Sequence, residues 1–130
     1  MVQKEVAERI VAQAGKMSIL AVSVQYYADA KYLFTVPKTA FDPVPKVDSA
    51  IIRITRNLGI EDNKDETKKL FRVVKAGFSA KRKTLANNLS NSFKIDKREV
   101  EQKLVSLGFS VNTRAQELSV EHWKKLQGIL

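Results

Sequence analysis

Apolar residues in the second half of the chain recur at the three- and four-residue intervals typical of amphipathic helices. Leu85 and Leu89 mark one predicted helix, Asp96 stands where it can cap the next, and Ser119 where it can cap the last. Gly108 lies past the end of the helix that Asp96 begins. The pattern therefore predicts a small all-α region. Its other apolar positions are Leu70, Val73, Val74, Gly77, Phe78, Val100, Leu104, Leu107, Val120, Trp123, Leu126 and Leu130.

The N-terminal stretch predicts two further helices. Apolar residues at four-residue spacing, followed by Gly15, predict a helix over Gln3–Ala14. The next stretch, Ile19–Ala28, is apolar nearly all round, which fits either a buried helix or a buried strand. We expect a helix because the stretch is long and Ser18 is available as its N-cap.

Two short segments predict β-strands. Lys31–Val36 and Ala50–Arg56 are rich in β-branched or aromatic residues. We expect them to pair antiparallel at one edge of a sheet, joined by a Pro-rich loop. Tyr26 and Tyr27 are expected to pack under that sheet.

A polar stretch without periodicity separates these two parts of the chain. It runs from Asn57 to Glu66 and is apolar only at Leu58 and Ile60. Such composition is typical of a connecting segment. We therefore predict a first unit over 1–57, a linker over 58–66 and an α-helical unit over 67–130.

The loop between the predicted strands, F-D-P-V-P-K-V-D-S-A, holds an aromatic side chain ahead of two prolines. Pro43 and Pro45 each fix their own φ and disfavour helical backbone in the residue before them. Phe41 therefore stands at the start of a stiff, extended loop. A Phe held in this way is suited to stacking on a base, although packing beside Val36 and Val47 in a local core is the alternative interpretation.

Composition limits the chemistry available. The 130 residues include no cysteine and one histidine, so disulfides, thiolate metal sites and a zinc site are not expected. No apolar run approaches the length of a membrane span and no signal-peptide pattern follows Met1, so we expect a cytoplasmic protein without a membrane partner. The net charge of +9 favours a polyanionic partner.

Most of the excess positive charge lies between residues 68 and 103. Lys81, Arg82 and Lys83 stand together at a predicted helix start, where backbone N–H groups add to the attraction for phosphate. Arg72 and Lys75 lie on the preceding helix and are further candidates for RNA binding. The alternative is a solvated helix face with no ligand.

Other side chains that often act in catalysis are given structural interpretations here. Asp48 and Ser49 are expected to be turn and strand-start residues rather than an acid and a nucleophile. Trp123 lies on an apolar stripe and is expected in the core. His122 is expected to be exposed, without the partners of a catalytic triad.

Five stretches together resemble the ribosomal RNA adenine dimethyltransferases, in particular the small-subunit type. Their order and spacing match that family over nearly the whole chain, and the Phe-Pro loop and the F-S-A-K-R-K-T-L stretch are specific together. A related large-subunit dimethyltransferase family shares the Phe-Pro loop, but R-K-T-L-A-N-N-L and R-A-Q-E-L-S-V favour the small-subunit type. The five stretches are Met1–Ala7, Gln25–Ala28, Phe41–Ala50, Phe78–Leu89 and Arg114–Val120.

The resemblance implies a fold and a set of site residues. The fold is an α/β fragment, the C-terminal part of a Rossmann-like class I methyltransferase domain followed by a small all-α domain. Phe41 is implied to stack on the target adenine, and the cluster at Lys81–Lys83 to contact rRNA phosphates. The residue Arg114, with its neighbours Glu117 and Leu118, matches the family's closing motif, and we expect it to join helices. The resemblance also implies that Pro43, Pro45, Lys46 and Ser49 support the loop that receives the target base.

The resemblance also implies what this chain lacks. Members of the family hold S-adenosylmethionine with a Gly-rich turn and an acidic residue, ahead of an N-L-P-Y-like tetrapeptide. The five glycines of this chain are scattered and form no G-x-G turn. We therefore expect the chain to correspond to the C-terminal half of the enzyme, to bind no cofactor and to be inactive alone. Its expected partners are small-subunit rRNA, the small ribosomal subunit and the missing N-terminal half.

Two alternatives from other functional classes remain at this point. One is a non-catalytic rRNA-binding or ribosome-assembly module, in which the basic helices suffice and Phe41 is structural. The other is a basic structural domain that binds no nucleic acid. The full enzyme implied by the resemblance would instead dimethylate two adjacent adenines of small-subunit rRNA.

Overall fold

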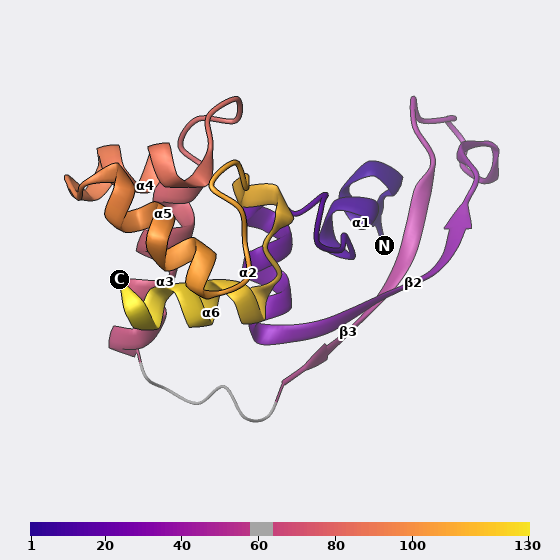
Figure 1. Cartoon of the computed structure of the whole chain (residues 1–130). Helices are drawn as coiled ribbons and strands as arrows, with labels where there is room; N and C mark the ends of the chain where they lie inside the picture. Colours follow the sequence, from indigo (N-terminus) through magenta and orange to yellow (C-terminus); the bar gives the residue numbers. More distant parts are fainter. Residues whose placement is uncertain (58–63) are drawn as a thin grey trace.

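The computed structural model describes residues 1–57 and 64–130, in which helices gather at one end and a strand pair extends from them (Figure 1). The N-terminal elements are β1 (Val2–Gln3), α1 (Lys4–Ile10), α2 (Ile19–Tyr27), β2 (Ala28–Val36), the 3₁₀ helix η1 (Lys38–Ala40) and β3 (Ser49–Arg56). The C-terminal elements are α3 (Lys64–Gly77), α4 (Leu85–Phe93), α5 (Lys97–Ser106), the 3₁₀ helix η2 (Ala115–Glu117) and α6 (Val120–Ile129).

Within the described residues the strands form one antiparallel sheet in the order β1-β3-β2. The register pairs Ala28 with Arg56 at one end of the β2–β3 ladder and Val36 with Ser49 at the other. Leu33 is the extra residue of a bulge, since Tyr32 pairs with Ile52 and Phe34 with Ile51. The predicted antiparallel pair is therefore confirmed, with β2 beginning three residues earlier than expected.

The first predicted helix is shorter than its sequence pattern indicated. Helix α1 covers Lys4–Ile10 and does not continue to Ala14. The Nε2 of Gln25, on α2, donates hydrogen bonds to the carbonyl oxygens of Ile10 and Ala12, both at 2.8 Å. In a helix continued to Ala14 the Ile10 carbonyl oxygen would accept from the Ala14 N–H, but here the Gln25 side chain donates to it instead.

The ambiguous stretch after Ser18 is a helix, as predicted. The Ser18 hydroxyl oxygen accepts a hydrogen bond from the Ala21 N–H at 3.1 Å, the expected N-cap arrangement. The helix ends where Ala28 adopts extended backbone and starts β2.

One hydrophobic core joins α2 to all the C-terminal helices. Its buried members include Val22 on α2, Val74 on α3, Leu89 on α4, Leu104 on α5 and Trp123 on α6. The Trp123 side chain is fully buried, which confirms the core position predicted for it. Because α2 precedes the predicted linker in sequence, the core is built from both sides of that segment.

The prediction that two tyrosines pack under the sheet was wrong. Tyr26 is buried among the helices, where its ring meets Phe71 edge-on at 5.4 Å and its hydroxyl bonds the Thr67 hydroxyl at 3.0 Å. Tyr27 is exposed and its ring lies parallel to that of Phe71. Both rings therefore contact Phe71 of α3 instead of packing under the sheet.

The start of the helical region also differs from prediction. Most of the predicted linker, 58–66, lies outside the described residues, but α3 begins at Lys64, within it. Helix α5 has the predicted caps, with the Asp96 carboxylate accepting from the Arg98 N–H at 2.8 Å and Gly108 at φ +91° past its end. The Thr84 hydroxyl caps α4 by accepting from the Asn87 N–H.

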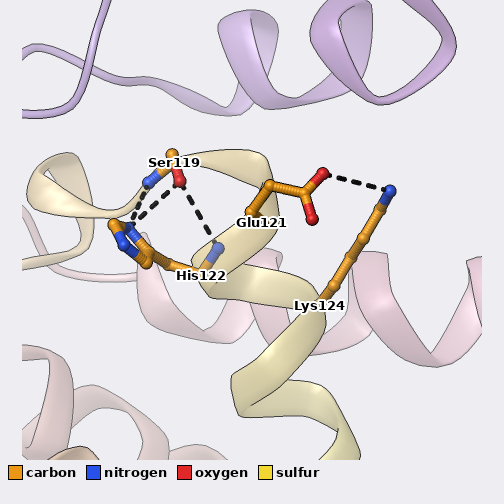
Figure 2. Close-up of polar contacts among 4 residues, drawn as sticks. All are labelled: Ser119, Glu121, His122 and Lys124. Atoms are coloured by element: carbon orange, nitrogen blue, oxygen red, sulfur yellow. Dashed lines mark hydrogen bonds and ion pairs between the residues drawn. The ribbon is translucent and has the colours of Figure 1, made fainter. Parts of the chain in front are cut away.

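The last helix begins with a reciprocal cap that corrects the expectation of an exposed His122. The His122 N–H donates to the Ser119 Oγ at 3.4 Å, and the Ser119 N–H donates to the His122 Nδ1 at 3.1 Å (Figure 2). The half-buried imidazole also meets the Phe109 ring edge-on at 4.8 Å. Figure 2 also shows Glu121 paired with Lys124 on the same helix. The carboxylate oxygen and the ammonium nitrogen of this ion pair are 3.6 Å apart. His122 therefore closes the N-terminus of α6.

Candidate nucleic-acid interface

The Pro-rich loop sits at the far tip of the strand pair, away from the helical end (Figure 1). Phe41 directly follows η1 and is half-buried. The peptide bond between Asp42 and Pro43 is cis, and both prolines are exposed. The alternative interpretation has Phe41 packed beside Val36 and Val47 in a local core, but Val47 is itself 48% exposed.

Asp48 anchors this loop at both of its ends. Its carboxylate accepts a hydrogen bond from the Lys38 N–H at 2.8 Å, next to the end of β2. Its carbonyl oxygen accepts from the Lys4 N–H at 3.0 Å, at the start of α1. Ser49 is the first residue of β3 and pairs with Gln3 and Val36. Asp48 and Ser49 therefore have the turn and strand-start positions expected of them.

A shallow cleft of about 400 Å³ opens beside the loop. Its lining carries cations and carboxylates in equal number, so it offers no strong net field to an anion. Lys46, predicted to support the loop, is one of the cations. The lining residues are Lys4, Glu5, Glu8, Lys38, Lys46, Val47 and Asp48.

A second cleft, of about 510 Å³, lies where the first turn of α2 faces the turn before α4. We call it the basic cleft, because it is lined by five cations and, among the described residues, by no carboxylate. Its cations are Arg9, Lys16, Lys81, Lys83 and Arg114. The remaining lining residues are Met17, Ser18, Ile19, Leu20, Gly77, Phe78, Ala80, Ala115 and Gln116.

Backbone hydrogen bonds hold the walls of the basic cleft together. The Gln116 carbonyl oxygen accepts from the Gly15 N–H at 2.9 Å and from the Met17 N–H at 3.1 Å. The Thr113 carbonyl oxygen accepts from the Leu85 N–H at 2.9 Å, at the start of α4. The segment around η2 therefore ties the loop before α2 to the turn before α4.

The predicted RNA-binding cations do not all share this site. Lys81 and Lys83 line the basic cleft, while Arg82 is exposed in the same turn without lining it. Lys75 is exposed on α3. Arg72 lies over the Phe93 ring at 5.8 Å, beside a smaller cleft that Lys69 also lines.

Three of the cleft cations were missed by sequence reasoning. Arg9 and Lys16 belong to the first predicted unit, and Arg114 was expected only to join helices. The Arg114 N–H does have that structural role, since it donates to the Glu117 carboxylate at 2.6 Å. For Arg114 a signal was available in the sequence, because the closing motif places its guanidinium next to residues that hold the backbone in position. No such signal was available for Arg9 or Lys16.

The described part of the chain has neither a cluster of metal-ligating side chains nor a helix that could span a membrane. No group of three or more His, Cys, Asp or Glu side chains in residues 1–57 and 64–130 is placed to hold a metal ion. No helix in those residues is long and apolar enough to cross a membrane.

The model of the family described as ribosomal RNA adenine dimethylase matches residues 1–130. The chain belongs to this family. Ribosomal RNA small subunit methyltransferase A of Nostoc sp. (strain PCC 7120) is 42% identical over 132 residues, covering 100% of this chain and 48% of the relative. The protein of the same name from Geobacillus kaustophilus is 39% identical over 135 residues, covering 100% and 46%.

Two solved structures have a similar fold. The 23S rRNA methyltransferase ErmE has a TM-score of 0.74 at 25% identity, over 97% of this chain and 51% of that protein. A dimethyladenosine transferase from Plasmodium falciparum has a TM-score of 0.73 at 26% identity, over 95% and 53%. The resemblance to this family is confirmed, and the α/β fold fits a fragment of a Rossmann-like methyltransferase.

The chain spans about half the length of the curated relatives it matches. The match is consistent with the C-terminal half of the enzyme, as the sequence motifs implied. The sequence relatives named above are of the small-subunit type, which the closing motif and the basic stretch favoured.

Proposed function

We propose that this chain is the rRNA-holding half of an rRNA adenine N6,N6-dimethyltransferase. The whole enzyme would transfer methyl groups from S-adenosylmethionine to two adjacent adenines of small-subunit rRNA. Within it, Phe41 would stack on the extruded adenine and the basic cleft would hold phosphates. The observation that carries this proposal is the basic cleft, where cations from distant segments converge without a carboxylate in the described lining.

The proposed role of Phe41 rests on its mounting. A base that leaves its stack needs an aromatic face in exchange, and stacking on an aromatic side chain contributes about 1–3 kcal/mol. The loop that holds Phe41 is fixed by two prolines and by the two hydrogen bonds that Asp48 accepts. A ring held in this way loses little conformational entropy when a base binds.

The residues present do not fit S-adenosylmethionine. The cofactor site of this fold class needs a strand, a Gly-rich turn and a helix N-terminus in succession. In the described residues, β1 runs directly into α1 without a Gly-rich turn between them. The strand β2 is entered directly from α2 and left through η1, and β3 is entered from the Pro-rich loop. We therefore expect methyl transfer only together with a cofactor-binding half.

The first test measures binding and transfer side by side. Immature small ribosomal subunits would be incubated with the chain and labelled S-adenosylmethionine, and subunit binding would be followed across a salt series. We expect binding that weakens steeply with salt and no transfer of label. Transfer by the chain alone would overturn the expected lack of a cofactor site, and absence of binding at low salt would overturn the RNA-holding role.

A second experiment compares the loss of the Phe41 ring with the loss of another phenylalanine ring, that of Phe34. Phe41→Ala should weaken binding of an RNA hairpin with an unpaired adenine by about 5- to 150-fold, the equivalent of one stacked base. Phe34→Ala removes an equally large ring from β2, where it is 56% exposed, and should leave binding unchanged. Equal effects of both changes, or no effect of either, would favour a ribosome-assembly module in which Phe41 is structural.

A further inference from the structure

The basic cleft has an apolar part that phosphate binding does not need. Met17, Ile19, Leu20 and Phe78 line it together with the cations. Ile19 and Leu20 form the first turn of α2 and are 41% and 38% exposed. Apolar side chains left open to water beside a cationic rim suit a ligand that has both a charged and a flat apolar part.

The cations around this apolar part come from three regions of the chain. Arg9 and Lys16 come from the side of α1 and α2, Lys81 and Lys83 from the turn before α4, and Arg114 from the start of η2. Arg9 also pairs with Glu5 at 3.1 Å, an exposed ion pair of little strength. The other four cleft cations take part in none of the ion pairs found within the described residues. Their charge therefore remains available to a ligand.

RNA offers this combination only where it is unpaired. In a duplex the bases are stacked and paired, so a cleft meets phosphates and sugars. An unpaired nucleotide can instead place its base on apolar or aromatic side chains while its flanking phosphates reach cations on either side. An acidic peptide would satisfy the cations but would leave Ile19 and Leu20 exposed.

We propose that the basic cleft binds one unpaired nucleotide of the RNA, with its base on Ile19, Leu20 and Phe78. This rests on the proposed function and adds a second place where a base is held. The cleft is lined by residues around the start of α2 and the turn before α4. These elements lie at the helical end of the molecule, whereas the loop between β2 and β3 lies at the tip of the strand pair (Figure 1). An RNA bound at both the basic cleft and the Phe41 loop would have two unstacked nucleotides held by the protein.

The walls of the cleft are fixed before the ligand arrives. The Gln116 carbonyl oxygen holds the loop that carries Lys16 and Met17, and the Thr113 carbonyl oxygen holds the start of α4. Phe78 is packed against Trp123, with ring centroids 5.7 Å apart. A base would therefore enter a preformed site, which lowers the conformational cost of binding.

The test compares single-stranded and duplex RNA with the full chain. Fluorescence anisotropy would follow a labelled adenine hexamer and a blunt duplex of the same length in low salt. Leu20→Ser should weaken hexamer binding by at least about fivefold and leave duplex binding unchanged. Val105→Ser, which changes a 54% exposed apolar residue on α5, is the matched control and should alter neither. Thermal melting by circular dichroism would confirm that both variants are folded.

A charge variant separates this proposal from general phosphate binding. Lys83→Gln should weaken binding of both RNAs and reduce the salt dependence of each. Equal losses of hexamer and duplex binding in Leu20→Ser, or no loss of either, would overturn the nucleotide site while leaving RNA binding intact. Equal competition by a poly-glutamate peptide would also overturn it. Failure of the unmodified chain to bind either RNA would instead refute the proposed function.

Discussion

The helical end and the strand pair are stabilised in different ways. Among the helices, side chains such as Leu85, Leu89 and Trp123 are fully buried in one core. On the strand pair, Phe34 and Ile54 are 56% and 55% exposed, and Leu33 is also open to water. The helices are therefore held by burial of apolar surface, whereas the strands are held by their backbone ladder and by the anchors at Asp48.

This contrast also separates the two candidate sites of the chain, the basic cleft and the Phe41 loop. The basic cleft is formed by elements that share the helical core, so its shape depends on that core. The Phe41 loop depends on local hydrogen bonds and on two prolines. Changes in the core should therefore disturb the cleft before the loop, and changes at Asp48 should do the reverse.

The largest expected effect comes from the centre of the core. Trp123→Ala removes a fully buried indole and should lower the free energy of unfolding by about 3–5 kcal/mol. Urea denaturation followed by circular dichroism measures this without relying on the lost fluorophore. Phe34→Ala, on the strand pair, should cost less than about 1 kcal/mol. Equal decreases in the free energy of unfolding in the two variants would contradict the idea that the helices and the strand pair are stabilised differently.

A smaller effect is expected where α3 meets α6. A methyl group added at Gly77 would lie 2.5 Å from the Trp123 Cη2 and 2.9 Å from the Leu85 Cδ1. Gly77→Ala should therefore destabilise by about 1–3 kcal/mol, because neither buried side chain can move freely. Gly128→Ala, on α6, meets nothing within 4 Å and should be neutral or slightly stabilising. A stabilised Gly77→Ala protein would show that the core packs more loosely there than the structure indicates.

The smallest effect concerns the anchor of the Pro-rich loop. Asp48→Ala removes the acceptor of the Lys38 N–H and should change global stability by about 1 kcal/mol or less. Amide hydrogen exchange should nevertheless be faster at Lys38, while amides of α6 keep their protection. Asp29→Ala, at an exposed carboxylate on β2, serves as the control. Unchanged exchange at Lys38 would mean that the prolines alone fix the loop.

Local patterns predicted most elements because each has a local cause. Ser18, Asp96 and Ser119 cap the helices they were expected to cap, and the two main strands pair as expected. The failures have long-range causes. The end of α1 depends on Gln25 of α2, and the positions of Tyr26 and Tyr27 depend on Phe71 of α3.

The candidate sites divide in the same way. The Phe41 loop is a contiguous motif, so its stiffness was predictable from Pro43 and Pro45. The basic cleft was predicted only at Lys81 and Lys83. Arg114 had a signal in the closing motif, whereas Arg9 and Lys16 belong to a segment that meets the site through hydrogen bonds to the distant Gln116. The positions of Arg9 and Lys16 in the sequence do not indicate that folding places them near the turn before α4.

The two hydrogen bonds accepted by the Gln116 carbonyl oxygen also have a consequence for synthesis. They join Gly15 and Met17 to Gln116, which is synthesised much later than either of them. During translation the loop before α2 must wait for Gln116 to leave the ribosome, and closing so long a loop has an entropic cost. The strand pair needs no such delay. The nascent chain should therefore acquire its Phe41 loop before its basic cleft.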